Sequence, residues 1–237
     1  MTTIIRSDAV LSRPMPGMQL LPSLGISGIM HRWHGDTARG SINGSVTEVG
    51  DAAGGAHLGT VEGQVILRET NGRRYIDLGV GDATRNRISG GGAKSTPDAF
   101  TLAALVYFEP SWSISGAAAS VLATQDGNSH GIGVSPAEGK VSAYAGGAIL
   151  ATSAVPAGWH SVVVSYNRNG VETITVDNGA PVQGEVHGNT FAAMSAFGLV
   201  GRPALKVRFL DAAVIGHELT AAQRGIVHTA LLAQKPS

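Results

Sequence analysis

The chain has 237 residues, of which 17 are Lys or Arg and 17 are Asp or Glu, so its formal net charge at neutral pH is zero. This balance provides no basic face, so we expect no nucleic-acid partner. The absence of cysteine excludes disulfides and thiolate chemistry. Charged residues make up only 14% of the chain and glycines number 33, a composition typical of many short strands joined by tight turns.

The sequence also gives no sign of export or of membrane insertion. Residues 1–6 contain one Arg but no following apolar stretch that ends at a small-residue cleavage site, so we predict no signal peptide. No apolar run reaches the roughly 18 residues that a membrane helix needs. We therefore expect a protein that is made in a cytoplasm and is not inserted into a membrane.

Residues 1–30 differ from the rest because Pro and Gly interrupt them while many of the other positions are apolar. We interpret them as an extended N-terminal arm, which packs either along its own domain or on another subunit. The second alternative, on which our functional hypothesis depends, predicts a homo-oligomer, most simply a trimer or another cyclic ring. The assembly residues that we assign to the arm are Ile4, Ile5, Met15, Met18, Leu20 and Leu21.

Residues 31–237 are predicted to form one domain built from short strands. Turn dipeptides such as Asn71-Gly72 separate short apolar runs. In one of these runs Val162, Val164 and Tyr166 alternate, and therefore share one face of a strand. The runs that we predict as strands include 65–67, 75–78, 100–108, 161–166, 171–176 and 206–215.

One segment near the end of the chain has a helical pattern, at about 219–234. Thr220 is followed three residues later by Gln223, which is the spacing of a capping box. The apolar residues on one side of this helix are Ile226, Val227, Ala230 and Leu231. Such a stripe needs a surface to cover, and we expect an edge or end of the strand domain to provide it.

Several segments resemble, in order, those of concanavalin A-like and laminin-G-like jelly rolls. The run 159–166, WHSVVVSY, is similar to the family's W-H-x-V-V-x-x-Y strand. The turn Val176-Asp177-Asn178-Gly179 is one residue longer than the V-D-G turn common there. The segments that carry the resemblance are 47–63, 98–102, 159–166, 172–179, 209–215 and 219–224.

This resemblance implies an all-β fold, an antiparallel β-sandwich of jelly-roll, concanavalin A-like type, with the N-terminal arm and one C-terminal helix. A chain that joins an apolar arm to one such domain also resembles bacteriophage virion proteins. The resemblance thus implies a non-enzymatic virion structural protein, a tail or baseplate component or a capsid decoration, with other virion proteins as partners. The alternative function is that of a carbohydrate-binding adhesin that recognises host-surface glycans.

Sugar binding in this fold would use an aromatic platform beside hydrogen-bonding side chains. Trp112 follows Pro110 and is flanked by Ser, and Tyr144 precedes a Gly-Gly turn, so we expect both rings to be exposed. Asp126 and Asn128 lie in a turn-rich segment and complete this candidate glycan site. We expect Trp159 in the core.

We expect either no cofactor or a calcium ion, because many proteins of this fold bind calcium. Asp126, Asn128 and Asp177 are the candidate oxygen ligands, although Asp and Asn also favour turns for backbone reasons alone. His31 and His34 would face opposite sides of a strand, which argues against a transition-metal site there.

The sequence contains no motif that indicates an enzyme. Glycosidases of this fold place alternate carboxylates on one strand, and no such string occurs here; Glu172 and Asp177 have odd spacing. The Gly-rich segments 40–44 and 131–135 do not match the Gly-x-Ser-x-Gly elbow of Ser-His-Asp hydrolases. We therefore predict a protein that binds and assembles and does not catalyse.

Overall fold

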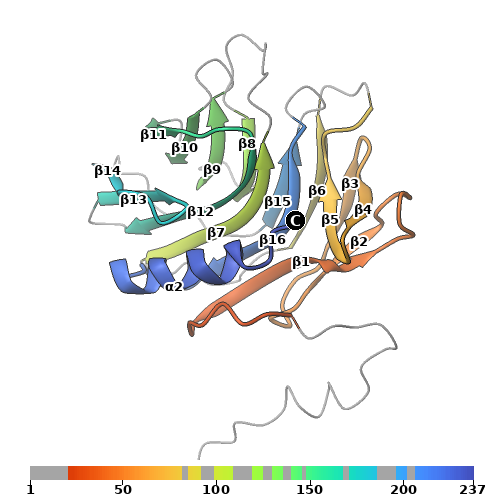
Figure 1. Ribbon diagram of the computed structural model, residues 1–237, viewed down its shortest axis with the longest axis horizontal. Helices are drawn as coiled ribbons and strands as arrows, with labels where there is room; N and C mark the ends of the chain where they lie inside the picture. Colours follow the sequence, from red (N-terminus) through yellow and green to blue (C-terminus); the bar gives the residue numbers. More distant parts are fainter. Residues whose placement is uncertain are drawn as a thin grey trace, which may run out of the picture.

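The computed structural model describes residues 21–81, 85–91, 99–108, 119–124, 130–135, 140–145, 148–167, 171–185, 196–201 and 206–237. Within these residues, sixteen strands form one continuous antiparallel sheet that folds into two layers (Figure 1). One C-terminal helix accompanies them. The fold is therefore the predicted jelly-roll, lectin-like β-sandwich.

The first layer runs from one end of the sheet to the point where it bends. Its strands, in spatial order, are β11 (Ala148–Ala154), β10 (Lys140–Ala145), β9 (His130–Ser135), β8 (Ala119–Thr124), β15 (Ala196–Gly201), β6 (Asn86–Gly91) and β3 (Leu58–Glu62).

The second layer continues the sheet beyond the bend. Its strands are β2 (Glu48–Asp51), β1 (Ile29–Arg39), β16 (Arg208–Ile215), β7 (Ala99–Phe108), β12 (Gly158–Asn167), β13 (Val171–Val176) and β14 (Val182–Glu185). The hairpin of β4 (Ile66–Thr70) and β5 (Arg73–Asp77) is attached to β16, where β5 pairs with the first residues of that strand. At the far ends of the sheet β11 contacts β14, so the two layers also meet there.

The main core lies between the two layers. On β7, Phe100, Leu102, Ala104, Val106 and Phe108 alternate toward it and are not exposed. The alternation predicted for β12 is confirmed, because Val162, Val164 and Tyr166 belong to the same core. The hydroxyl of Tyr166 also donates to the backbone oxygens of Gly131 and Tyr144 in the opposite layer, at 2.8 and 3.1 Å. This side chain therefore connects the two layers.

A second apolar cluster covers the outer face of the β16–β7–β12 layer. Helix α2 (Ala221–Leu232) lies across this face in Figure 1, and Val227 and Leu231 pack on Val163 and Leu105. The predicted capping box is confirmed: the Thr220 hydroxyl accepts from the Gln223 amide, and the Gln223 side chain accepts from the Thr220 amide. Most of β7 is buried on both faces, which explains why its sequence is a nearly continuous apolar run.

The base of the N-terminal arm is attached to this same outer face. Leu24 is 1% exposed within the second cluster, and the backbone oxygen of Pro22 accepts from Arg32 at 2.7 Å. Of the assembly residues only Leu21, which is half-buried, belongs to the described part of the chain. Ile4, Ile5, Met15, Met18 and Leu20 lie outside it, so their role in assembly remains a prediction. None of the described helices is long and apolar enough to cross a bilayer.

Candidate functional site

Four polar or aromatic side chains form a row across the outer face of the second layer. The register places Trp159 of β12 opposite Tyr107 of β7, Tyr107 opposite Arg208 of β16, and Arg208 opposite Asp77 of β5. Directly opposite residues of antiparallel strands point to the same face of a sheet. Their chain neighbours Val106, Phe108 and Phe209 belong to the main core, so the row faces away from it.

Tyr75, on β5, completes this arrangement, and we call Trp159, Tyr107, Tyr75 and Arg208 the aromatic platform. The Trp159 ring meets Tyr75 and Tyr107 edge to face, with centroids 5.6 and 5.7 Å apart. The guanidinium carbon of Arg208 lies 4.6 Å from the centroid of Tyr107 and 5.9 Å from that of Tyr75. Edge-to-face rings and a stacked guanidinium hold one another in fixed orientations.

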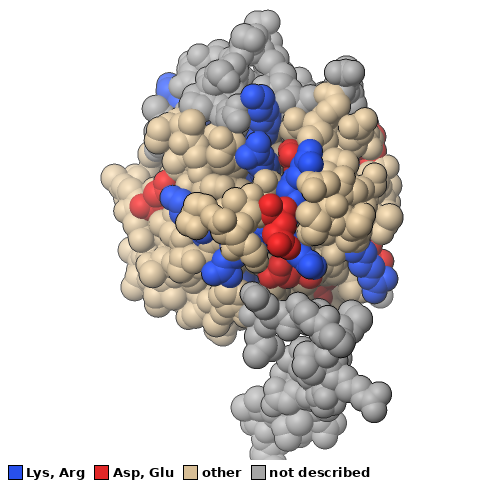
Figure 2. All heavy atoms as spheres, turned by 45° about the vertical axis from the view of Figure 1, so that its right-hand side comes forward, with Lys and Arg blue, Asp and Glu red and all other residues tan. Residues whose placement is uncertain are grey.

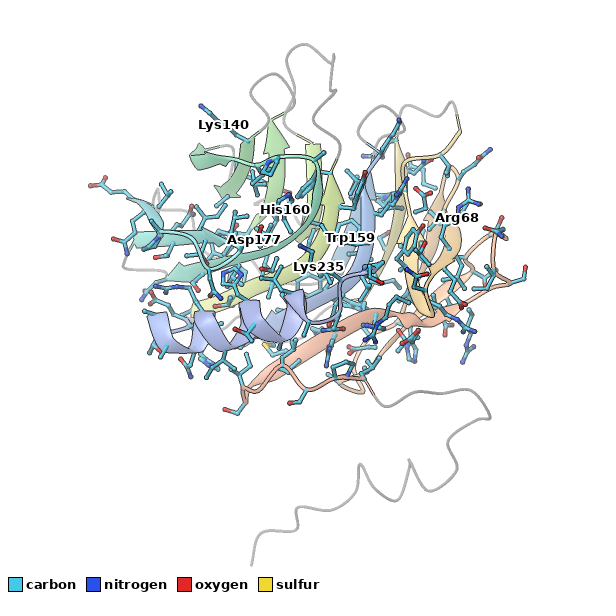
Figure 3. All side chains as sticks on the ribbon, viewed as in Figure 1. Arg68, Lys140, Trp159, His160, Asp177 and Lys235 are labelled. Carbon is cyan, nitrogen blue, oxygen red and sulfur yellow. The ribbon has the colours of Figure 1, made fainter. Side chains whose placement is uncertain are left out.

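The aromatic platform lies where the helix leaves the sheet uncovered. Along β12, Ser161 and Val163 lie under α2, whereas Trp159, two residues before Ser161 and on the same face, is half-exposed. Tyr107 and Arg208 are also half-exposed, and Tyr75 is 9% exposed. In the view of Figure 3, Trp159 lies between His160 and Asp177 on one side and Arg68 on the other. The exposed rings are thus supported from below by the sheet and by one another.

Charged groups border the aromatic platform on the side of β4 and β5. Asp77 Oδ2 lies 3.5 Å from Arg68 Nε and 4.0 Å from Arg208 Nε, while Asp77 Oδ1 accepts from the Gly79 amide at 2.9 Å. Two guanidinium groups therefore share a single carboxylate. Figure 2 shows basic and acidic side chains gathered along the middle of one face, with mostly uncharged surface around them.

Trp159, expected in the core, packs against the second apolar cluster on the outer face but is half-exposed and does not belong to the main core. The signal that could have corrected this is the alternation of β12 itself. Val162, Val164 and Tyr166 face inward, and Trp159 lies an odd number of residues before them on the same strand. Its side chain is therefore expected on the opposite, outer face. What no pattern in the sequence shows is that Tyr107, Tyr75 and Arg208 lie beside it, because these residues come from distant strands.

Of the residues predicted for glycan binding, only Tyr144 belongs to the described part of the chain. It lies on β10, in the other layer, so the structure does not bring it to the aromatic platform. Its ring lies over Gly131 and Gly133 of β9: a Cβ at Gly131 would come within 2.5 Å of its hydroxyl oxygen. Tyr144 is half-buried with a buried hydroxyl group, so its ring is less exposed than expected. Trp112, Asp126 and Asn128 lie outside the described residues.

Asp177, predicted as a calcium ligand, is described, and both of its carboxylate oxygens are hydrogen-bonded within the protein. Oδ2 lies 2.5 Å from His160 Nδ1, and Oδ1 accepts from the amide and the hydroxyl of Ser161 at 2.8 and 3.2 Å. Burial alone would raise the pKa of Asp177, but the hydrogen bonds from His160 and Ser161 and the charge of His160 lower it. The described residues contain no group of three His, Asp or Glu side chains that could hold a metal ion.

The network continues from Ser161 to helix α2. His228 Nδ1 lies 2.6 Å from the Ser161 hydroxyl oxygen, and His228 Nε2 lies 2.7 Å from that of Thr175. Burial lowers the pKa of His228 to about 4, with smaller and opposing effects of Asp177 and Arg224. Ser161 is 0% exposed and His228 is 1% exposed. Ser161 and His228 are therefore buried between the helix and the sheet, and their hydrogen bond attaches the helix to β12.

The two histidines of the first strand lie on opposite faces, as predicted. His31 stacks on Trp33, with centroids 5.4 Å apart, and its Nδ1 lies 2.6 Å from Asp51 Oδ2. His34 Nε2 lies 3.0 Å from the Gln234 side-chain oxygen on the other face. Both are buried, so neither is a candidate for an exposed metal site.

Comparisons with solved structures give the same fold. The binding domain of botulinum neurotoxin DC in complex with SialylT has a TM-score of 0.66 and 13% identity, over 88% of this chain and 52% of that chain. The receptor binding domain of botulinum neurotoxin mosaic serotype C/D has a TM-score of 0.64 and 9% identity, over 85% and 50%. A binding domain of botulinum neurotoxin DC in complex with rat synaptotagmin II has a TM-score of 0.59 and 13% identity, over 77% and 49%.

The chain thus spans about half the length of these neighbours. At these identities the likeness shows the fold, a lectin-like β-sandwich. No family model matches the sequence, and no curated protein matches it.

Proposed function

We propose that this protein is a non-enzymatic carbohydrate-binding module and that the aromatic platform is its glycan site. The observation that carries the proposal is the row from Trp159 to Arg208, in which half-exposed rings and hydrogen-bond donors lie together on one rigid face. Among the described residues, the Arg208 guanidinium stacks on Tyr107 and its Nε has no hydrogen-bond partner. The Arg208 side chain is 30% exposed although its Nε is buried, so a part of this side chain is accessible to a ligand.

The chemistry of the aromatic platform suits a sugar. A pyranose ring presents C–H groups on its faces and hydroxyl groups around its rim, so it packs on an aromatic ring while its rim accepts and donates hydrogen bonds. Trp159 and Tyr107 supply the apolar surface, and Arg208 supplies donors at its edge. Because Trp159 and Arg208 are two strands apart, the site spans about 10 Å, which a short oligosaccharide covers.

The structural neighbours support a binding role. They are titled as binding domains of botulinum neurotoxins, one of them in complex with SialylT. The sandwich fold alone does not specify a ligand, since it hosts many unrelated functions. We therefore locate the site in this chain from its aromatic platform and not from the structural neighbours.

A glycan array tests the proposal, using the full chain and two matched aromatic variants. Trp159→Ala removes the half-exposed indole of the aromatic platform, whereas Tyr144→Ala removes the ring predicted from the sequence, on the other layer. We expect the wild type to bind, Trp159→Ala to lose at least tenfold in affinity for the best glycan, and Tyr144→Ala to retain it. Circular dichroism melting confirms that both variants are folded.

The outcomes separate the two candidate sites. Loss in Tyr144→Ala with retention in Trp159→Ala would move the site to the other layer and overturn the proposal. Absence of binding by a folded wild type would overturn the glycan function altogether. Repeating the array with calcium and with EDTA tests the calcium alternative, which requires binding that EDTA abolishes.

We also propose a role in assembly, the virion structural function implied by the resemblance, with the homo-oligomer formed through the arm. The supporting observation is the fixed base of the arm, where Leu24 is buried and Pro22 is hydrogen-bonded to Arg32. Deletion of residues 2–20 tests it by light scattering. An unchanged molar mass of a multimeric wild type, or a monomeric wild type, would contradict assembly through the arm.

A further inference from the structure

Within the described part of the chain, the Nε of Arg208, the cation of the aromatic platform, makes no hydrogen bond. Arginine has five N–H donors, and within the described residues those of Arg208 meet no acceptor at hydrogen-bond distance. Its Nε is buried and without a partner, and Asp77 Oδ2 is 4.0 Å from it. Its side chain is 30% exposed. A buried donor without a partner costs free energy, so the position is suboptimal for the protein alone.

Packing fixes the orientation of this guanidinium. It lies over the Tyr107 ring at 4.6 Å and within 5.9 Å of the Tyr75 centroid, between two strands that are themselves hydrogen-bonded to β16. An arginine stacked on an aromatic face keeps its N–H groups directed outward in the plane of the fork. The fork is thus oriented before any ligand arrives, and its ordering cost on binding is reduced.

Among the described residues, Arg68 and Arg208 share the carboxylate of Asp77. Asp77 is the carboxylate closest to Arg208, and it is nearer to Arg68, at 3.5 Å, than to Arg208, at 4.0 Å. Asp77 Oδ1 also accepts from the Gly79 amide, so Oδ2 is the one oxygen that the two guanidinium groups share. By contrast, the nearby Arg74 pairs with Glu69 at 3.2 Å. Among these groups Arg208 has the longest ion pair and shares its counter-ion with Arg68.

From these three observations we infer that the ligand of the aromatic platform is an acidic sugar, whose carboxylate binds the Arg208 fork while its ring packs on Tyr107 and Trp159. This inference rests on the proposed glycan function. A planar fork matches the two oxygens of a carboxylate, and such charged pairs are the strong hydrogen bonds of protein recognition. A neutral sugar would use the rings but would leave the fork without its anion. Uronic acids and sialic acids both provide the required carboxylate.

Isothermal titration with two matched pairs of probes tests the inference. One pair is trigalacturonic acid and its methyl ester, and the other is sialyllactose and the methyl ester of sialyllactose; the members of each pair differ in whether the carboxyl group is charged. We expect the full chain to bind the acidic member of one pair about tenfold to a hundredfold more tightly than its neutral counterpart. The pair that shows the preference identifies the source of the carboxylate.

Variants of Arg208 then test whether this residue causes the preference for the acidic probe. Arg208→Gln should abolish the preference, so that the acidic and the neutral probe of a pair bind with affinities within about threefold of each other. Arg208→Lys keeps a charge without the fork and should retain only part of the preference. The control is Arg85→Gln, because Arg85 pairs with Glu62 at 2.9 Å beside β6, a strand that pairs with none of the strands of the aromatic platform.

Each outcome decides the question. Equal affinity for acidic and neutral probes in the wild type overturns the inference, and the proposed function survives if Trp159→Ala still weakens both. An acid preference that persists in folded Arg208→Gln or disappears in Arg85→Gln also overturns it. If no probe and no arrayed glycan binds the folded wild type, the proposed function itself fails.

Discussion

Arg32 and Asp211 form a two-point ion pair between β1 and β16. Nε lies 3.0 Å from Oδ1 and Nη2 lies 2.6 Å from Oδ2, and neither residue is more than 6% exposed. The third nitrogen of Arg32 donates to the backbone oxygen of Pro22, and the Gln234 amide donates to Asp211 at 3.1 Å. The pair therefore holds together two strands, the base of the arm and the segment after α2.

Breaking this pair on one side should be costly. Arg32→Met or Asp211→Leu alone leaves an uncompensated buried charge, and we expect each to lower the free energy of unfolding by about 3–5 kcal/mol. The double variant removes both charges and should be destabilised less than either single variant. Urea denaturation of the three variants measures this, and additive losses in the double variant would contradict it.

The stability of the protein should depend on the neutral form of His228. Burial lowers its pKa from 6.5 to about 4, so between these pH values the unfolded chain binds a proton that the folded chain does not. This contribution is complete above pH 6.5 and is lost as the pH falls toward 4, by about 3 kcal/mol at most. In Glu172→Gln, where the opposing effect described next is absent, the free energy of unfolding should fall over this range. A flat profile in that variant would contradict the assignment.

Glu172 should have the opposite effect. Its side chain faces the core, both carboxylate oxygens lack a hydrogen-bond partner among the described residues, and burial raises its pKa from 4.5 to about 7. The folded chain then holds a proton that the unfolded chain releases, so stability falls as the pH rises from 4.5 to 7. In His228→Gln this effect remains alone, and the free energy of unfolding should increase as the pH is lowered from 7 to 4.5. A decrease would show that Glu172 is charged in the fold.

His228 and Glu172 together predict how the stability of the unmodified protein depends on pH. Between pH 4.5 and 6.5 the two slopes have opposite signs and similar size, so the contributions of His228 and Glu172 largely cancel. We expect urea midpoints of the wild type to vary much less over this range than those of either single variant. Equal pH dependence in all three proteins would contradict both assignments.

The helix start provides a smaller, local test. The Thr220 hydroxyl accepts from the Gln223 amide at 3.3 Å, and Thr220→Ala removes this cap. Loss of such a cap costs about 1 kcal/mol, so the melting temperature should fall by a few degrees. Thr229→Ala, which removes an exposed hydroxyl within the same helix, serves as the control and should have less effect.

Local sequence patterns predicted the strands and turns well because each of these depends on residues that are close together in the sequence. The Asn71-Gly72 turn has both residues at positive φ, 50° and 72°, between β4 and β5, as a two-residue hairpin requires. Val162, Val164 and Tyr166 share the inner face, and Ile174 and Val176 do so on the next strand. Each of these expectations depends only on residues within one hairpin.

The site was harder to predict because it is assembled from four strands that are distant in sequence. Tyr75, Tyr107, Trp159 and Arg208 become neighbours only through the order β5, β16, β7 and β12, which no local pattern gives. The glycan residues chosen from the sequence were selected for turn-rich surroundings instead. Of these, Tyr144 turned out to lie against two glycines of the adjacent strand.

The position of β16 has a consequence for biosynthesis. This strand comes after all the others in the chain, yet it lies between β1 and β7 and also pairs with β5. A ribosome therefore has to complete nearly the whole domain before the second layer can close, and until then the edges of β1 and β7 lack their partner. Such pairing over long sequence separation folds slowly and exposes strand edges that aggregate. The nascent chain is thus expected to depend on chaperones until β16 has left the ribosome.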